Sequence, residues 1–231
     1  QRAFNSSWYA DNPDTIDASA VVNTITLTGN DHDNYIRASK AGDYIYAGQG
    51  NDTISLGAGN SYIYYEQYGG SDVILNYKTG ARIYFNDSKT GVENISVSGS
   101  DLIINTVDDE TVTLKNVRTQ TIYLYNNKDS TYYTGTLANA TISGGSAKLA
   151  SGTFYAPFYA DEISTIDASA VSNFISIQGG DDSEVIRAGK AGGRIYAGQG
   201  NDTISLGAGN DVYVYQGGED LIQDYNAVDK L

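Results

Sequence analysis

The sequence of 231 residues contains no cysteine, which excludes disulfide bonds and thiolate chemistry. Its single histidine, His32, leaves little room for histidine-based catalysis or for transition-metal sites. Lysine and arginine number 14 against 28 acidic residues, so the net charge is −14 and duplex nucleic acid is a poor partner. No apolar run approaches the roughly 18 residues of a membrane span, and nucleophile-elbow and phosphate-loop motifs are absent. We therefore expect no enzyme activity, no nucleic-acid partner and no membrane span.

Glycine, by contrast, is abundant. The 26 glycines accompany only two prolines, a balance that suggests repeated tight turns rather than proline-rich linkers. Hydrophobic residues make up 40% of the chain, which is enough for a packed core. Polar and apolar residues alternate in stretches such as TITLTGN (24–30), with the β-branched enrichment that is typical of strands. The composition and patterning predict an all-β protein.

The most regular part of the sequence is IYAGQGNDTISLGAGN, which occurs without a substitution at residues 45–60 and 195–210. Aligning the chain with itself at an offset of 150 extends the match to TIDASAV at residues 15–21 and 165–171. A repeat on this scale indicates a module of about 150 residues. We expect the sequence to be part of a longer tandem array of such modules; the alternative is a truncated two-copy protein.

Within each copy, a shorter period of nine residues places an acidic or polar side chain at the sixth position and an apolar one at the eighth. The acid positions are Asn34, Asp43, Asp52 and Ser61 in the first copy, and Glu184, Gly193, Asp202, Asp211 and Asp220 in the second. The apolar positions are Leu27, Ile36, Ile45, Ile54 and Ile63, then Ile177, Ile186, Ile195, Ile204 and Tyr213. We expect the apolar set to point inward.

The nine-residue period also predicts where metal ions would bind. If six residues form a tight turn and three form a strand, turns alternate between the two edges of a coil. Turns eighteen residues apart then stack, and their main-chain carbonyls and carboxylates converge on a shared gap. These hard oxygen ligands suit Ca²⁺ better than Mg²⁺, which keeps more of its waters.

The units resemble the repeats-in-toxin (RTX) nonapeptide, G-G-x-G-x-D-x-U-x, most closely at Gly48–Asp52, Gly198–Asp202 and Gly207–Asp211. The resemblance implies a calcium-bound parallel β-roll and secretion by a type I system, with folding on meeting external calcium. It covers residues 30–77 and 180–225 well and the region between them loosely. Ser61 and Gly193 depart from the family by replacing the acid.

The expected fold is all-β, with parallel β-rolls alternating with a small antiparallel β-hairpin region. Residues 86–126 lack the regular glycines and hold four alternating runs separated by turns, so hairpins there should cover the end of the coil. The expected segments are the end of a preceding linker or module (1–14), a first β-roll (15–85), the hairpin region (86–126), an irregular or weakly β linker (127–164) and a second, truncated β-roll (165–231).

The predicted calcium ligands lie in the stacked turns. They are Asp43, Gly48, Gly50, Asp52, Gly57, Gly59, Gly70 and Asp72 in the first copy, and Gly198, Gly200, Asp202, Gly207, Gly209, Asp211, Gly218 and Asp220 in the second. The strongest site should join the turns of Asp202 and Asp220, followed by that of Asp52 and Asp72. Asp43 and Asp211 should form weaker sites, because each faces a turn without a carboxylate.

The chain has 20 tyrosines, and the pairs Tyr44–Tyr62 and Tyr46–Tyr64 are each eighteen residues apart. On a β-roll such pairs would stack into ladders on an outward face. The ladders could simply cover the sheet or pack under the hairpin region. They could also form an association surface or a carbohydrate platform, and the sequence leaves these alternatives open.

The function that these features favour is a non-enzymatic, calcium-stabilised structural repeat on a bacterial surface or in a secreted protein. An adhesin stalk, a surface-layer protein and a self-assembling filament all fit, with partners that include calcium, identical modules and possible contacts to glycans or the cell surface. The alternative is the export and folding domain of a larger secreted enzyme, such as a protease or lipase.

Overall fold

The computed structural model describes residues 2–6, 13–65, 69–86, 91–107, 109–128, 130–137, 140–157 and 163–231. Half of the expected linker at 1–14, including Trp8, lies outside these ranges. The chain divides into two compact units, residues 1–134 and 135–231, and each is described by itself. None of the described residues belongs to a helix long and apolar enough to cross a membrane.

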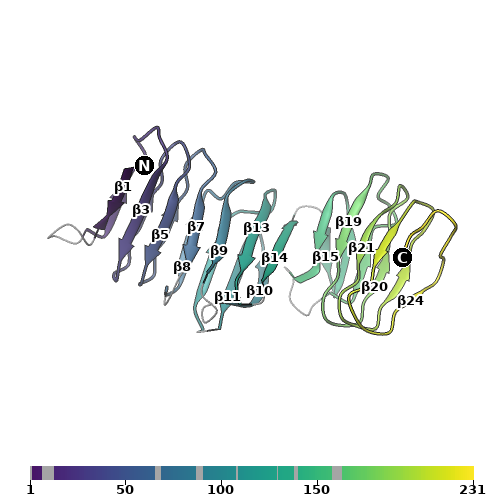
Figure 1. The fold of residues 1–231 in the computed structure, drawn as a ribbon. Coiled ribbons are helices and arrows are strands. Elements are labelled where there is room, and N and C mark those ends of the chain that lie inside the picture. Colours follow the sequence, from purple (N-terminus) through teal and green to yellow (C-terminus); the bar gives the residue numbers. More distant parts are fainter. Residues whose placement is uncertain are drawn as a thin grey trace. The chain divides into compact units, whose positions relative to one another are not determined.

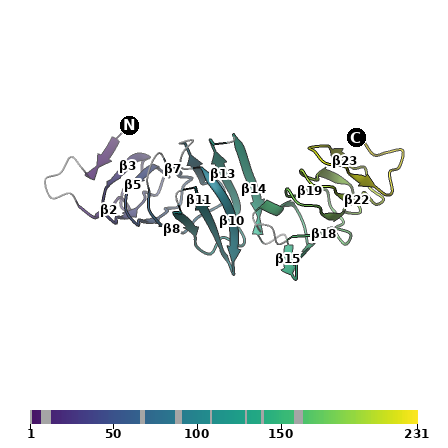
Figure 2. The same ribbon diagram turned by 90° about the horizontal axis from the view of Figure 1, so that it is seen from below.

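The first unit consists of two sheets between which the chain alternates (Figures 1 and 2). One sheet has the order β1 (Arg2–Asn5), β3 (Ile25–Asn30), β5 (Tyr44–Gly48), β7 (Tyr62–Tyr65), β9 (Arg82–Phe85), β13 (Thr121–Asn126) and β14 (Thr131–Thr136). The other has the order β10 (Val92–Ser98), β11 (Asp101–Thr106), β12 (Thr111–Leu114), β8 (Asp72–Leu75), β6 (Thr53–Ser55), β4 (Tyr35–Arg37) and β2 (Thr15–Asp17).

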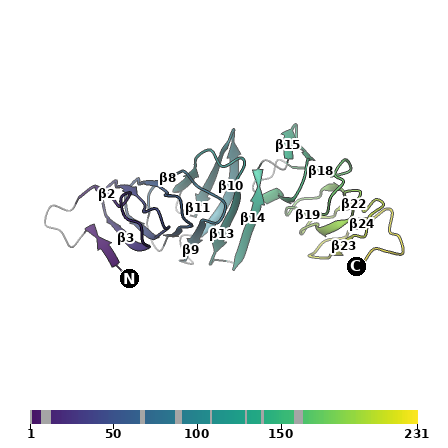
Figure 3. The same cartoon turned by 90° about the horizontal axis from the view of Figure 1, so that it is seen from above.

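The second unit repeats the arrangement with fewer strands (Figure 3). Its larger sheet has the order β15 (Ala140–Ser143), β16 (Ser146–Leu149), β18 (Thr165–Asp167), β20 (Val185–Arg187), β22 (Thr203–Ser205) and β24 (Leu221–Ile222). Its smaller sheet has the order β17 (Thr153–Tyr155), β19 (Ile175–Gln178), β21 (Gly193–Tyr196) and β23 (Val212–Val214). The predicted all-β parallel solenoid with a few antiparallel pairs is confirmed.

The core of each unit is a set of aliphatic ladders. Parallel pairing places Leu27, Ile45 and Ile63 in register in one sheet of the first unit, and all three side chains are fully buried. Ile186 and Ile204 continue the same pattern in the second unit. Each such side chain contributes about 1.5–3 kcal/mol through burial, so the inward position of the nonapeptide holds the coil together. The predicted inward positions are confirmed.

The hairpin region continues the solenoid rather than forming a separate layer. β10, β11 and β12 form an antiparallel meander, as the alternating runs predict. β12 then pairs in parallel with β8, and β13 pairs in parallel with β9. The last strands of the first coil are therefore covered by strands of the following region, which agrees with the expectation that the coil end needs a cover.

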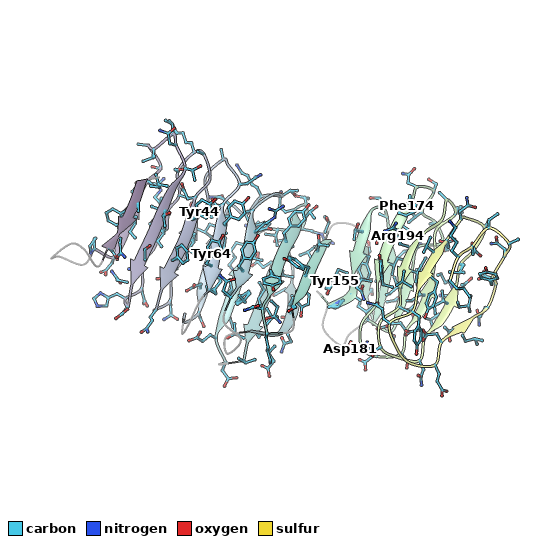
Figure 4. The ribbon with its side chains drawn as sticks, in the orientation of Figure 1. Tyr44, Tyr64, Tyr155, Phe174, Asp181 and Arg194 are labelled. Atoms are coloured by element: carbon cyan, nitrogen blue, oxygen red, sulfur yellow. The ribbon has the colours of Figure 1, made fainter. Side chains whose placement is uncertain are left out.

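Tyrosine ladders line the outward face of the first unit, and Figure 4 labels two of their members, Tyr44 and Tyr64. The ring centroids of Tyr44 and Tyr62 lie 5.3 Å apart, and those of Tyr46 and Tyr64 lie 5.0 Å apart, with nearly parallel planes. The predicted stacking is confirmed.

Close stacking of the turns makes alanine at Gly48 a severe change. Gly48 has φ of 107°, and a Cβ there would lie 2.1 Å from the carbonyl oxygen of Asn30. Gly99 is a matched control, because it has φ of 64° but nothing within 4 Å of a Cβ. We expect Gly99→Ala to lower the free energy of unfolding by about 1–2 kcal/mol through backbone strain alone. Gly48→Ala should cost about 1–3 kcal/mol more.

Urea unfolding of the calcium-loaded chain, followed by circular dichroism, measures both changes. An equal fall in the free energy of unfolding in the two variants would show that the close contact between stacked turns does not contribute to stability.

Candidate metal centre

The predicted glycines lie where one turn meets the next. At nearly all of them a Cβ would come within 3 Å of the backbone of the turn one coil earlier. The pairs are Gly48 on Asn30, Gly50 on His32, Gly57 on Ser39, Gly59 on Ala41, Gly70 on Gly50, Gly198 on Gly180, Gly200 on Asp182, Gly209 on Gly192 and Gly218 on Gly200. Gly207 is the exception, since its closest such neighbour lies at an ordinary 3.6 Å. The turns therefore stack as the eighteen-residue spacing predicts.

Acidic side chains form a ladder along one edge of the first unit. Oδ1 of Asp52 accepts a hydrogen bond from the Asn34 N–H at 2.6 Å. Oδ1 of Asp72 accepts one from the Asp52 N–H at 2.8 Å. Asp52 and Asp72 are each only 1% exposed, so each carboxylate reaches back beneath the preceding turn. The structure thus brings the predicted Asp52 and Asp72 turns together.

The same ladder runs along both edges of the second unit. Oδ1 of Asp202 accepts from the Glu184 N–H at 2.8 Å, and Oδ1 of Asp220 accepts from the Asp202 N–H at 2.9 Å. On the other edge, Oδ1 of Asp229 accepts from the Asp211 N–H at 3.1 Å.

Asp229 was missed from the sequence, although it follows Asp220 by one further nine-residue step. Its presence gives Asp211 a partner turn with a carboxylate one coil later, although the turn one coil earlier, at Gly193, has none.

Several of these buried acids keep an oxygen without a hydrogen-bond partner. The atoms are Oδ2 of Asp52, Oδ2 of Asp72, Oε2 of Glu184, Oδ2 of Asp202 and both oxygens of Asp211. A buried polar atom left unpaired is costly, and a buried unpaired charge more so. A hard cation would satisfy these oxygens, which is the donor chemistry that Ca²⁺ prefers. The residues present therefore fit a calcium ion.

Two predicted ligands differ from the rest. Asp43 already accepts hydrogen bonds at both oxygens, from the N–H of Ile25 and from the N–H and hydroxyl of Ser39. Oδ2 of Asp220 accepts a hydrogen bond from the phenol of Tyr213. Each oxygen of these two carboxylates thus has a hydrogen-bond partner, whereas Oδ2 of Asp52 and Oδ2 of Asp72 have none.

Carboxylates alone do not complete a site. Within the part of the chain that the structure describes, no three acidic or histidine side chains gather closely enough to hold a metal ion. Calcium takes six to eight oxygens, so main-chain carbonyls of the stacked turns would supply much of the shell. Asp52 and Asp72 would contribute carboxylates in the first unit. Asp202 and Asp211 would do so in the second.

Burial perturbs these acids strongly. Desolvation raises the pKa of Asp52 to about 7 and that of Asp72 to about 8. Burial and the charge of nearby Asp202 raise the pKa of Glu184 to about 8, and burial raises that of Asp211 to about 6. Without a cation, the ladder thus favours protonated carboxyl groups near neutral pH.

The raised pKa values predict that the calcium-free protein is stabilised by acid. An acid whose pKa is raised by folding binds its proton more tightly in the folded state, so its stabilising contribution is lost as pH rises through the folded pKa. From Asp72, Glu184 and Asp52, this loss should span about pH 4 to pH 8. The melting temperature in calcium-free buffer should therefore be higher at pH 5 than at pH 8.

The measurement uses metal-stripped buffers with 1 M NaCl, which screens the surface charges but not the buried ones. With saturating calcium the trend should reverse, since metal binding requires deprotonated ligands. A calcium-free melting temperature that climbs from pH 5 to pH 8 would contradict the arrangement of buried acids.

Comparison with known proteins identifies the class of these turns. Residues 28–63, 178–213 and 191–222 match the family described as RTX calcium-binding nonapeptide repeat (4 copies). These stretches are RTX calcium-binding nonapeptide repeats, and they form the β-solenoid described above. RTX repeats bind calcium ions, so the metal predicted from the turns is that of the family.

Other comparisons add little. No curated protein matches the chain. Among solved structures, the chain is similar to the extracellular lipase LipA from Serratia marcescens, at 13% identity and a TM-score of 0.22. The match covers 90% of this chain and 32% of the lipase chain, so the chain spans about a third of that protein's length.

Proposed function

We propose that the chain is a calcium-stabilised, non-enzymatic structural repeat of a secreted or cell-surface bacterial protein. The observation that carries the proposal is the ladder of buried acids in both units. Each acid of the Asp52–Asp72 pair caps a backbone N–H with one oxygen and leaves the other without a partner. A solenoid that needs only its aliphatic core would not retain such costly groups in two units.

In the folded chain, backbone groups and glycines would position the ligands of the ion. The backbone N–H groups of Asn34 and Asp52 orient the carboxylates of the following turns. The glycines allow the turns to approach closely enough for their carbonyls to converge. Bound calcium would neutralise the repulsion between the buried carboxylates and so couple metal binding to folding.

The coupling suits a protein that is exported unfolded. RTX repeats are typical of secreted proteins, and the extracellular medium offers millimolar calcium, the range in which extracellular calcium modules are tuned. The chain would stay unfolded in a low-calcium cytosol and fold outside the cell. The absence of cysteine removes disulfide formation as a requirement for that step.

The repetition within the chain supports a structural role over an accessory one. The segments 45–60 and 195–210 are identical and occur in two separate compact units. The described residues form solenoid turns and hairpins, with no separate catalytic domain among them. An adhesin stalk, a surface layer or a filament would use such modules in series.

The runner-up role is an export and folding domain attached to a secreted enzyme. A catalytic domain encoded upstream in the same gene would favour that role, and further modules of about 150 residues would favour the structural one.

Electron microscopy of the purified chain with and without calcium tests the proposed role. Ordered polymers or sheets that require calcium are expected for a structural module that associates with identical copies. Calcium-dependent folding into single, non-associating particles at high protein concentration would contradict the self-associating role.

A further inference from the structure

The outward face of the first unit differs from that of the second at matching positions. Tyr44, Tyr62 and Tyr64 correspond to Arg194, Val212 and Val214, although the turns between these strands are nearly identical in sequence. Figure 4 labels Tyr44 and Tyr64 on the first unit and Arg194 on the second. A β-solenoid of this kind therefore forms without the tyrosine ladder, and the aromatic face of the first unit needs another explanation.

The ladder is regular over three strands and then breaks. From β5 to β9 the rings lie nearly parallel, with Tyr64 and Tyr84 at 5.1 Å and an angle of 18°. Beyond β9 the planes turn: Tyr84 and Tyr125 meet at 59°, and Tyr125 and Tyr132 at 38°. In the regular part each ring covers its neighbour's face, which leaves ring edges and hydroxyls for other contacts. At the break the rings no longer lie parallel, and Tyr132 is an exposed side chain.

A cavity lies at this break. Its volume is about 340 Å³, within the range of small-ligand sites. Its lining comes from β9, β13 and β14 and includes Arg82, Tyr84, Tyr123, Tyr125, Tyr132 and Tyr133. Five tyrosines thus contribute to the lining of one cavity.

Arg82 is the one charged residue in the lining. Its guanidinium carbon lies 5.8 Å from the Tyr123 ring centroid and 5.9 Å from that of Tyr62, so flanking rings hold it. Arg82 makes no ion pair with an acidic side chain among the described residues. On a chain with a net charge of −14, an unpaired arginine in a lining free of carboxylates selects for anions.

We propose that this cavity binds an acidic saccharide, a sugar chain that carries carboxylate groups. The apolar face of a pyranose ring packs on tyrosine faces, and its hydroxyls bond to phenols. The guanidinium fork of Arg82 receives the carboxylate in paired hydrogen bonds. A protein partner is less suited, because a stable protein interface buries about 800 Å² on each side, far more than a cavity of this size offers.

Isothermal titration calorimetry of the full chain in calcium-replete buffer tests the proposal, with tetragalacturonate as the probe. Both solutions contain the same calcium concentration, and a titration into buffer removes the heat of calcium binding by the sugar. Saturable binding at one site per chain is expected. Arg82→Gln should weaken it at least tenfold, because a charge-assisted bond is lost. Arg194→Gln removes the same charge from the other unit and should leave the affinity unchanged.

A second variant and a neutral sugar test the aromatic and the charged parts of the cavity separately. Tyr132 is 69% exposed, so Tyr132→Ala preserves folding even if Arg82→Gln does not, and it should weaken tetragalacturonate binding several-fold. Maltotetraose, a neutral chain of the same length, should bind at least tenfold more weakly than tetragalacturonate. The proposal is overturned by an absence of saturable binding, by equal affinity for the two sugars, or by an equal loss of tetragalacturonate affinity in Arg82→Gln and Arg194→Gln.

Discussion

Removal of calcium is expected to lower the melting temperature of the chain by about 10–20 °C for each occupied site. The estimate follows from the free energy of ligand binding, about 2.7 kcal/mol when calcium is at a hundred times its dissociation constant. In a unit of about 100 residues, 1 kcal/mol shifts the melting temperature by about 4–8 °C. The buried carboxylates explain the direction, because at pH 8 the ionised forms of Asp52 and Asp72 repel one another until a cation neutralises them.

Differential scanning calorimetry in saturating calcium and in chelator measures the shift, and magnesium at the same concentration is the control. Magnesium should restore little of the loss, since it requires a tighter geometry and keeps several waters. Equal melting temperatures in calcium and in chelator would rule out metal-coupled folding.

Neutralising Asp52 should change the melting temperature in opposite directions with calcium and without it. Asp52 lies between the turns of Asn34 and Asp72 and so borders two gaps at once. In calcium, Asp52→Asn removes a charged ligand from both gaps. The free energy of unfolding should fall by up to about 5 kcal/mol when calcium is at a hundred times its dissociation constant. In chelator at pH 8, above the raised pKa of Asp52 of about 7, the same change removes a buried charge and should raise the melting temperature.

Asp181→Asn is the matched control, because Asp181 is an exposed turn residue of the second unit, labelled in Figure 4. It should change the melting temperature by less than about 2 °C in either state, as expected for a surface substitution within ±0.5 kcal/mol. Asp202→Asn should repeat the crossed pattern of Asp52→Asn in the second unit. A loss of the same sign in calcium and in chelator would show that Asp52 serves only as a backbone cap.

The regular part of the fold was predictable because one nine-residue period encodes both its core and its turns. Ile54 and Ile204 occupy the inward position and are fully buried. Gly50 and Gly200 lie at the contact between stacked turns. In a solenoid each residue meets its counterpart one coil away, so sequence spacing translates directly into contact.

The irregular parts were less predictable, because they depend on partners distant in sequence or outside the period. Alternation marked the strands of residues 86–126, but it carries no information about which strand each would join, so the parallel pairing of β12 with β8 was missed. The Ser39 hydroxyl donates a hydrogen bond to Asp43, and the Tyr213 phenol donates one to Asp220. The nine-residue period does not predict these side-chain contacts. Asp229, by contrast, follows the period and could have been found.

Calcium should lie between stacked turns on the acid ladder. A crystal structure grown in calcium, with anomalous diffraction data, tests it most directly. An anomalous peak is expected between the turns of Asp52 and Asp72, about 2.3–2.6 Å from carboxylate and carbonyl oxygens. A corresponding peak should lie in the second unit beside Asp202. Peaks confined to exposed surface acids, or no peaks at either ladder, would contradict calcium binding between the stacked turns.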